Sequence, residues 1–290
     1  MSNLPVINIP FAVTHTVTKQ QEEGSFLKLC NKTVIVTAAT RGIGLACARA
    51  CAAEGAHVYL AARNMDAAYA RAKELCDAGF QAKAVYNDAG KPETFHAMAQ
   101  FVAEDAGSID VLINNFGTSD PGRDLDFSGT DPQVFLDTVT RNLRSVFMAS
   151  QAAVRHMRTH GGSIVNISSV SSIVPDISQV AYGTSKAAIN YLTKLIAVQE
   201  ARHNIRCNAV LPGMTATEAV SQHLSPTFRD VFLRHTPLGR MGYPEEIAAA
   251  AVFFASDDSS YATGQILALS GGFGLATPLY GDFADAKMQR

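Results

Sequence analysis

The sequence predicts an α/β protein built on a doubly wound parallel sheet of seven strands with helices on both faces. Two patterns carry this prediction. Short apolar, β-branched runs alternate with longer helix-like stretches along most of the chain, as expected for repeated strand–helix–strand units. Runs such as VLIN and SIVNI are almost uninterrupted by polar residues, which is typical of strands buried on both faces of a parallel sheet.

The elements follow in order. The first strand, 33–37, leads through a Gly/Thr/Arg turn into a helix that ends near Glu54, with Gly55 as its C-terminal cap. Further strands are expected at 57–62, 81–86, 110–114, 163–168, 206–211 and 265–270. Helices are expected after the second strand and at 92–105, 133–159, 180–203 and 245–255. Right-handed crossovers between these elements give a Rossmann-like sheet.

Length and composition favour one domain. The chain has 290 residues, of which 47% are hydrophobic and 17% charged, so it can bury a large core and lacks the signature of disorder. We expect an N-terminal extension over 1–30 and a single domain over 31–290 that includes a C-terminal tail. The segment 218–235 shows no strand pattern and is a candidate lid loop.

Net charge and cysteine spacing argue against several classes of protein. The 24 Lys and Arg nearly cancel the 26 Asp and Glu, so neither a nucleic acid nor a membrane is expected as a partner. The five cysteines form no C-x-x-C pair, which argues against a disulfide framework or a zinc ribbon. Cys47 and Cys51 are expected to be buried and apolar. No secretion signal or membrane span is recognisable, so we expect a cytoplasmic protein.

A glycine-containing turn marks a nucleotide site. Residues 37–44, TAATRGIG, connect the first strand to the first helix, where backbone N–H groups and the helix dipole favour a pyrophosphate. The residues assigned to cofactor binding are Thr37, Thr40, Arg41, Gly42, Ile43 and Gly44. Ala38 stands where the usual pattern has its first glycine, and we expect its backbone to avoid positive φ.

The second strand predicts which dinucleotide binds. NAD sites place an acid about 20 residues after the glycine turn to bind the ribose 2′-OH. Here the strand ends in Leu-Ala-Ala and is followed by Arg63, with no acid before Asp66. Arg63 and Arg41 could hold a 2′-phosphate by charge-assisted hydrogen bonds. The sequence therefore predicts NADP; the alternative is two solvated arginines.

Tyr182 and Lys186 are the candidate catalytic pair. They lie four positions apart near the start of a helix and therefore share a face. A nearby ammonium lowers the pKa of a phenol, which makes the tyrosine a usable acid/base. Tyr69 and Lys73 have the same spacing, but no other candidate catalytic residue accompanies them, and we interpret them as part of an exposed helix surface. Ser169, by contrast, follows a buried strand at the carboxyl edge where Tyr182 is expected.

Two other patterns are weaker. His156 and His160 have a spacing that can bind a metal, but the HExxH glutamate is absent, so we expect an exposed helix end and no metal. The basic pairs Arg141/Arg144 and Arg155/Arg158 could dock a phosphopantetheine carrier, but we interpret them as a solvated helix face. No G-x-S-x-G motif of an α/β-hydrolase occurs.

Taken together, the motifs resemble the short-chain dehydrogenase/reductase family over about residues 28–275. They are TAATRGIG, NNFG, Asn142, Ser169, YxxxK and PGMTAT, in that order. The resemblance implies that Tyr182 is the acid/base, that Ser169 polarises the substrate oxygen, and that Asn142 supports a proton relay. It implies that Lys186 lowers the tyrosine pKa and binds the nicotinamide ribose. Further cofactor contacts implied in the same way are Asp88, Asn115, Gly213, Met214 and Thr217.

Within that family the chain is similar to bacterial bile-acid 7α-hydroxysteroid dehydrogenases. The stretches that carry this likeness are NNFGTSDPGRDLDF, GGSIVNISSVSSIVPDISQVAYGTSK, IRCNAVLPG, FFASDDSSYATG and the tail TPLYGDF. The resemblance implies a steroid substrate and a homotetramer, with Phe116, Ile173, Val174 and Met214 as candidate walls of the steroid trough. The alternatives are a 12α- or 3-hydroxysteroid dehydrogenase, a reductase of 3-oxoacyl thioesters or sugars, and an NADP-binding sensor without catalysis.

Overall fold

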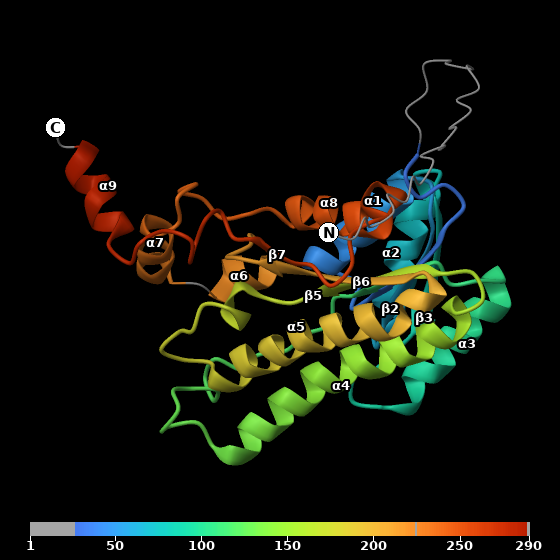
Figure 1. The fold of residues 1–290 in the computed structure, drawn as a ribbon, viewed down its shortest axis with the longest axis horizontal. Helices are drawn as coiled ribbons and strands as arrows, with labels where there is room; N and C mark the ends of the chain where they lie inside the picture. The colour runs from blue at the N-terminus through green and yellow to red at the C-terminus, as the bar shows by residue number, and fades with distance from the viewer. Residues whose placement is uncertain (1–26, 224, 289–290) are drawn as a thin grey trace, which may run out of the picture.

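The structure, a computed structural model, describes residues 27–223 and 225–288. Within these residues, seven strands pair in parallel in the order β3-β2-β1-β4-β5-β6-β7 (Figure 1). They are β1 Thr33–Thr37, β2 His57–Ala62, β3 Gln81–Tyr86, β4 Val111–Asn114, β5 Gly162–Ile167, β6 Ile205–Pro212 and β7 Ile266–Leu269. The predicted fold class is confirmed. Most of the predicted N-terminal extension, residues 1–26, lies outside the described residues.

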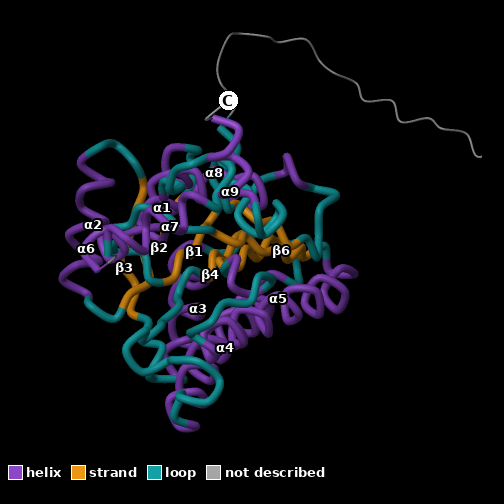
Figure 2. Tube along the Cα trace, turned by 90° about the vertical axis from the view of Figure 1, so that its left-hand side faces the viewer, coloured by secondary structure: helices purple, strands orange, loops and turns teal. Residues whose placement is uncertain are grey.

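Helices cover both faces of the sheet. Figures 1 and 2 show α1, α2 and α8 on one face and α3, α4 and α5 on the other. Three shorter helices, α6, α7 and α9, gather near the end of the molecule to which β6 leads (Figure 1). The bounds are α1 Gly42–Ala53, α2 Met65–Asp77, α3 Glu93–Ala106, α4 Pro132–Met157, α5 Val180–Glu200, α6 Glu218–His223, α7 Pro226–Arg234, α8 Pro244–Ala255 and α9 Tyr280–Met288.

The hydrophobic core has two halves, one on each face of the sheet. Along β1, Val34 and Val36 belong to the cluster that includes the buried residues of α1 and α8. Ile35, between them, belongs to the cluster beneath α3 and α4. Successive side chains of a strand point to opposite faces, and here both faces are buried, which is why the strand sequences lack a polar–apolar alternation. Cys47 and Cys51 are fully buried in the first cluster, as predicted.

The expectation of a loop over 218–235 is wrong, because this segment forms α6 and α7. Ser225 caps α7 by accepting a hydrogen bond from the Phe228 backbone N–H at 3.2 Å, and Pro226 occupies the first turn. Serine at the cap followed by proline is a recognised helix start. Ser225 and Pro226 carry this signal in the sequence, although the segment lacks the periodicity of a strand. The other helices and strands for which bounds were predicted begin and end within three residues of those bounds, whereas α9 lies in the predicted C-terminal tail.

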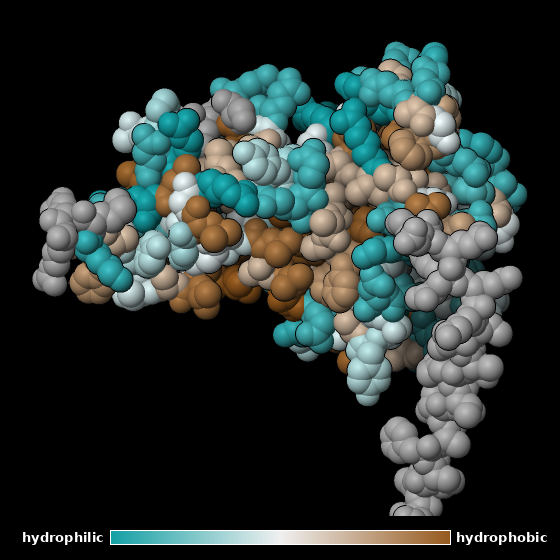
Figure 3. Space-filling model, turned by 90° about the horizontal axis from the view of Figure 1, so that it is seen from above, coloured by the Kyte–Doolittle hydropathy of each residue, from teal (hydrophilic) through white to brown (hydrophobic). Residues whose placement is uncertain are grey.

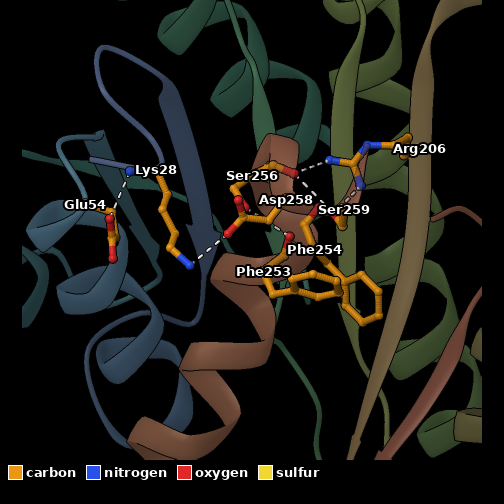
Figure 4. A network of polar contacts seen from close by, with 8 residues as sticks. All are labelled: Lys28, Glu54, Arg206, Phe253, Phe254, Ser256, Asp258 and Ser259. Carbon is orange, nitrogen blue, oxygen red and sulfur yellow. Dashed lines mark hydrogen bonds and ion pairs between the residues drawn. The ribbon is translucent and has the colours of Figure 1, made fainter. Parts of the chain in front are cut away.

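Polar contacts tie the start of the described chain to the body (Figure 4). The Lys28 backbone N–H donates to Glu54 Oε2 at 2.9 Å, and the Lys28 ammonium lies 2.7 Å from Asp258. Arg206 of β6 donates to the Ser259 hydroxyl at 2.8 Å. The first two contacts join Lys28 to the C-terminal end of α1 and to the segment after α8, and the third joins that segment to β6.

The described residues hold neither a candidate membrane span nor a candidate metal cluster. No helix there is long and apolar enough to span a bilayer, and no group of three or more potential metal ligands occurs. His156 and His160 accordingly have no acidic third ligand in the part of the chain that the structure describes. The Tyr69 side chain is 59% exposed, and Lys73 pairs with Asp77, which confirms that this second Tyr–Lys pair is a helix surface.

Candidate active site

A cavity of about 260 Å³ opens at the carboxyl edge of the sheet. The strand order reverses direction between β1 and β4, and ligands of open α/β sheets bind at this kind of switch point. Eight of the sixteen predicted site residues line this cavity. The cavity is lined by Ile43, Asn115, Gly117, Ile167, Ser168, Ser169, Tyr182, Lys186, Pro212, Gly213, Met214, Thr215, Thr217 and Val220.

The turn between β1 and α1 requires its two glycines. Gly42 has φ +53°, a left-handed conformation that costs other residues about 1–2 kcal/mol. A Cβ on Gly44 would lie 2.4 Å from the Ala38 carbonyl oxygen and 2.5 Å from Asn115 Nδ2, which is closer than atoms can approach. These glycines therefore let the start of α1 pack against the ends of β1 and β4.

The prediction that Ala38 avoids positive φ is wrong, because Ala38 has φ +52°. Asn115 supplies the reason. Its side-chain amide donates to the Thr37 carbonyl at 3.2 Å and to the Ala38 carbonyl at 3.3 Å. These two bonds offset the cost of the left-handed alanine.

Thr37 and Asn115 were both assigned to cofactor binding. In the structure their side chains stabilise the turn between β1 and α1. The Thr37 hydroxyl accepts hydrogen bonds from the backbone N–H groups of Asn115 (2.9 Å) and Phe116 (3.2 Å). Thr37 is 2% exposed, so its side chain braces β1 against the end of β4. Only Asn115 of this pair also lines the cavity.

The first turn of α1 fits an anion. Its N-cap residue, Arg41, makes no side-chain cap, and no protein acceptor among the described residues takes the N–H groups of Gly42, Ile43 and Gly44. Uncapped N–H groups at a helix N-terminus bind phosphate well. The residues present therefore fit the pyrophosphate of a dinucleotide.

Two arginines stand beside this turn. The side chains of Arg41 and Arg63 are exposed, and neither forms an ion pair within the described part of the chain. Thr40 is half-buried in the same turn. Asp88, after β3, accepts a hydrogen bond from the Gly90 N–H at 2.8 Å, which shapes the loop that would face the adenine.

Tyr182 and Lys186 share one face of α5 and meet Ser169 in the cavity. Ser169 follows β5 and is 8% exposed. Burial raises the pKa of Tyr182 above its ordinary value, while a side-chain hydrogen bond with Ser169 acts in the opposite direction. The Lys186 ammonium lies 5.7 Å from the centre of the tyrosine ring. Burial has the larger effect on the pKa of Tyr182, and the lowering assigned to Lys186 stays a prediction.

Lys186 is held deep in the site. Its side chain is 2% exposed, and its ammonium donates to the Ile167 carbonyl oxygen at 2.9 Å. Burial lowers the pKa of Lys186 to about 8 because the charged form loses its hydration. A Cβ on Gly117 would lie 2.9 Å from the ammonium nitrogen, so the glycine of NNFG makes room for the lysine.

Asn142 of α4 is fully buried and acts on two neighbouring segments. Its side-chain oxygen accepts from the Thr118 N–H at 2.8 Å, and its amide donates to the Thr118 carbonyl at 2.9 Å. The amide also donates to the Ser185 hydroxyl at 3.0 Å. These contacts fix the segment after β4 against α5, whereas the implied proton relay stays a prediction.

The predicted nicotinamide-end residues form the opposite wall. Gly213 follows β6, and a Cβ there would lie 2.7 Å from Ser270 Cα. Met214 and Thr217 line the cavity. The Thr217 methyl group lies 3.3 Å from the place a Gly42 Cβ would occupy, so this wall closes onto the glycine turn.

The predicted steroid-trough residues do not gather in one place. Phe116 packs against the core cluster beneath α3 and α4 and is not among the residues that line the main cavity. Ile173 lines a separate cavity of about 340 Å³ beside Phe127 and Ile177. Val174 contacts Gly274, so it faces the segment after β7. Met214 alone lines the main cavity.

Sequence reasoning missed two polar arrangements that support the site. Asn114 and Asn166 are buried, and the amide of Asn114 donates to Asn166 Oδ1 at 2.9 Å and to Ser150 at 3.0 Å, which ties β4 to β5 and α4. Asp124 is buried and contacts the start of α5. The partners of both are distant in sequence, so no local pattern reveals them.

Comparison with known proteins agrees with this geometry. A family model described as enoyl-(acyl carrier protein) reductase matches residues 37–274. The chain is 48% identical over 257 residues to a 7α-hydroxysteroid dehydrogenase of Clostridium sardiniense, covering 88% of this chain and 98% of that protein. The chain belongs to the short-chain dehydrogenase/reductase family. It is therefore an enzyme of the alcohol dehydrogenase/ketone reductase type that uses a nicotinamide cofactor.

Two further similarities place this short-chain dehydrogenase/reductase among its relatives. A 7α-hydroxysteroid dehydrogenase of Paraclostridium sordellii is 46% identical over 267 residues, covering 90% of this chain and 98% of that protein. A solved 7α-hydroxysteroid dehydrogenase in complex with NADH and 7-oxo glycochenodeoxycholic acid has a TM-score of 0.81 and 34% identity. That match covers 86% of this chain and 96% of the other.

Proposed function

We propose that this enzyme interconverts a hydroxyl group and a ketone on a steroid, and that the group is the 7α-hydroxyl of a bile acid. The observation that carries the chemistry is the convergence of Ser169, Tyr182 and Lys186 on one cavity at the carboxyl edge of the sheet. The steroid and its ring position rest on the names of the relatives with 46–48% identity.

The mechanism follows from what these side chains can donate and accept. The bound nicotinamide supplies the hydride acceptor or donor at the carbinol carbon. Ser169 hydrogen-bonds the substrate oxygen, and Tyr182 takes the hydroxyl proton during oxidation or returns it during reduction. The Lys186 ammonium, held by the Ile167 carbonyl, stabilises the phenolate that forms when Tyr182 has given up its proton.

We propose NADP as the cofactor. The support is the pair of exposed arginines beside the glycine turn, Arg41 and Arg63, and the lack of an acid at the end of β2. One related enzyme has been solved with NADH, so the choice depends on this chain's own residues. A carboxylate near the 2′-position would repel a phosphate, whereas arginine binds it with two parallel hydrogen bonds.

We propose that α6 and α7, which follow β6, form a lid over the substrate site. Val220 of α6 and Met214 line the cavity. Phe232 of α7 stacks on Phe273 with 4.2 Å between ring centres, so the lid is joined to the segment after β7. Removal of residues 218–235 should raise the steroid KM, and an unchanged KM would exclude a role in substrate binding.

We propose a homotetramer in the cytoplasm. Exposed apolar side chains lie on two separate faces: Leu136, Phe147, Tyr191 and Val198 on α4 and α5, and Phe253, Tyr261 and Leu267 on and near α8 and β7. Figure 3 shows a broad apolar area on the upper face of the molecule. Two self-complementary faces build a tetramer from two kinds of dimer contact. All five cysteines are free thiols, which fits a reducing compartment.

Initial rates at 340 nm test the function. The panel contains chenodeoxycholate, cholate, 12-hydroxy and 3-hydroxy analogues, a 3-oxoacyl thioester and a sugar, each with NADP(H) and NAD(H). We expect turnover of the 7α-hydroxylated steroids with NADP. Turnover of the thioester alone would favour the acyl reductase, and no turnover of any member would favour a cofactor-binding sensor.

A further inference from the structure

The catalytic helix α5 does not cap its own N-terminus. The first turn of any helix leaves N–H groups without acceptors inside the helix. At α5 the N-cap residue is Gln179, which has φ +59° and makes no side-chain cap. Since Tyr182 is the third residue of this helix, its backbone belongs to the turn that needs an acceptor from elsewhere.

Asp124, 57–58 positions earlier in the chain, supplies that acceptor. Its Oδ1 accepts from the Ala181 N–H at 2.9 Å, and its Oδ2 accepts from the Tyr182 N–H at 2.9 Å. Its backbone carbonyl accepts from the Gln179 N–H at 3.1 Å. The same segment adds a bond between the Ser119 hydroxyl and the Gln179 side-chain oxygen at 2.6 Å.

The environment of Asp124 shows why a carboxylate is needed there. Its side chain is 0% exposed, and it forms no ion pair with any cation in the described part of the chain. Its charge is therefore balanced by two N–H groups and by the positive end of the α5 dipole. Burying a carboxylate costs free energy unless its oxygens are hydrogen-bonded. Here both oxygens are used to accept the N–H groups at the start of α5.

We propose that Asp124 is a positioning residue for Tyr182, which sets the phenol at its working place relative to Lys186 and Ser169. This inference rests on the acid/base role proposed for Tyr182. Lys186, one turn further along α5, has an anchor of its own in the Ile167 carbonyl. Without Asp124 the tyrosine would shift while the lysine stays, and the pair would lose its alignment.

The substitution Asp124→Asn tests this with almost no change of shape. It replaces one acceptor oxygen with an NH₂ group that faces a backbone N–H. We expect kcat to fall about 10- to 100-fold, as for a catalytic group misplaced by about 1 Å, while the KM for NADP stays within about 2-fold. The primary deuterium isotope effect on kcat should rise, because the chemical step becomes slower than product release. Loss of general stability alone would not produce this combination.

Asp126→Asn is the matched control. Asp126 lies two residues on, is exposed, and accepts hydrogen bonds only from nearby groups such as the Ser128 and Gly129 N–H groups. Its variant should keep the wild-type kcat. Thermal melting and NADP binding establish that each variant is folded. Should Asp124→Asn not fold, Asp124→Ser, which retains one acceptor oxygen, is judged by the same kinetic criteria.

Two results would overturn the inference: a kcat within about 2-fold of wild type in the folded variant, or a loss of kcat matched by an equal loss of NADP affinity. Tyr182→Phe is measured in parallel. If that variant is active, the proposed function itself fails. If it is inactive while Asp124→Asn is fully active, only the role of Asp124 fails.

Discussion

The side-chain amide of Asn115 donates a hydrogen bond to the carbonyl oxygen of Ala38, at 3.3 Å, and Ala38 has φ +52°. Asn115 thus holds a non-glycine residue in the left-handed region at the centre of the nucleotide turn. The contact joins the end of β4 to the end of β1, the two strands between which the cofactor site opens. It also explains why this turn works without its usual first glycine.

Ala38→Gly should stabilise the protein. Glycine adopts positive φ without the alanine penalty, and part of that gain is offset by the greater freedom of glycine in the unfolded chain. We expect a net gain of up to about 1 kcal/mol in urea unfolding. Ala39→Gly, at a buried neighbour without positive φ, is the control and should destabilise. A loss of stability in Ala38→Gly would refute the account of this turn.

Gly44→Ala should abolish tight cofactor binding. The new Cβ would lie 2.4 Å from the Ala38 carbonyl and 2.5 Å from the Asn115 amide, so the start of α1 must move away from the turn. We expect at least a roughly 10-fold loss of NADPH affinity in a fluorescence titration. Gly122→Ala, where the nearest atom is 3.6 Å away, should bind normally. Wild-type affinity in Gly44→Ala would show that the helix start is not part of the site.

Arg63→Asp should reverse the cofactor preference. The carboxylate would repel a 2′-phosphate but accept a hydrogen bond from a ribose 2′-OH. We expect the affinity for NADP to fall by about 10-fold or more, with NAD binding unchanged or improved. Arg155→Asp, an exposed residue of α4, serves as the charge control. Equal losses of affinity for NADP and NAD would show that Arg63 does not bind the 2′-phosphate.

Lys186→Met should remove activity without lowering stability at neutral pH. The folded-state pKa of Lys186 is lowered from 10.5 to about 8, so folding is penalised wherever the lysine is charged in both states. That penalty is on the order of 3 kcal/mol, is fully present below pH 8, and fades as the pH rises from 8 to 10.5. The variant is free of this penalty but loses the hydrogen bond that Lys186 donates to the Ile167 carbonyl.

Urea unfolding of this variant and the wild type at several pH values measures the effect. The stability of the variant relative to wild type should be greatest below pH 8 and should decline toward pH 10.5. A difference that grows with pH over this range would contradict the assignment of a buried, charged Lys186.

The fold was predictable because each strand and each long helix carries its own local signal. Val34, Ile35 and Val36 already indicate a strand buried on both faces, and Gly55 marks the end of α1 with φ +85°. The α6–α7 segment was missed although Ser225 and Pro226 form a standard helix start. A segment without strand periodicity can still be helical, as α6 and α7 are.

The site was predictable to the extent that its residues form short motifs. Ser169, Tyr182 and Lys186 do meet at one cavity. The conformation of Ala38 depends on Asn115, and the start of α5 depends on Asp124. Both partners are more than 50 positions away, so propensity at the position itself gave the wrong answer for Ala38 and none for Asp124. The tyrosine pKa likewise depends on burial, which spacing alone does not reveal.

The most direct test of the central claim compares two bile acids with NADP as the oxidant. Chenodeoxycholate carries a 7α-hydroxyl, and deoxycholate carries a 12α-hydroxyl instead; both carry the 3α-hydroxyl. The account predicts that the wild-type enzyme oxidises chenodeoxycholate to its 7-oxo product, identified by mass spectrometry and NMR. It also predicts that deoxycholate is not oxidised and that Tyr182→Phe is inactive. Oxidation of deoxycholate but not chenodeoxycholate, or full activity of Tyr182→Phe, would contradict it.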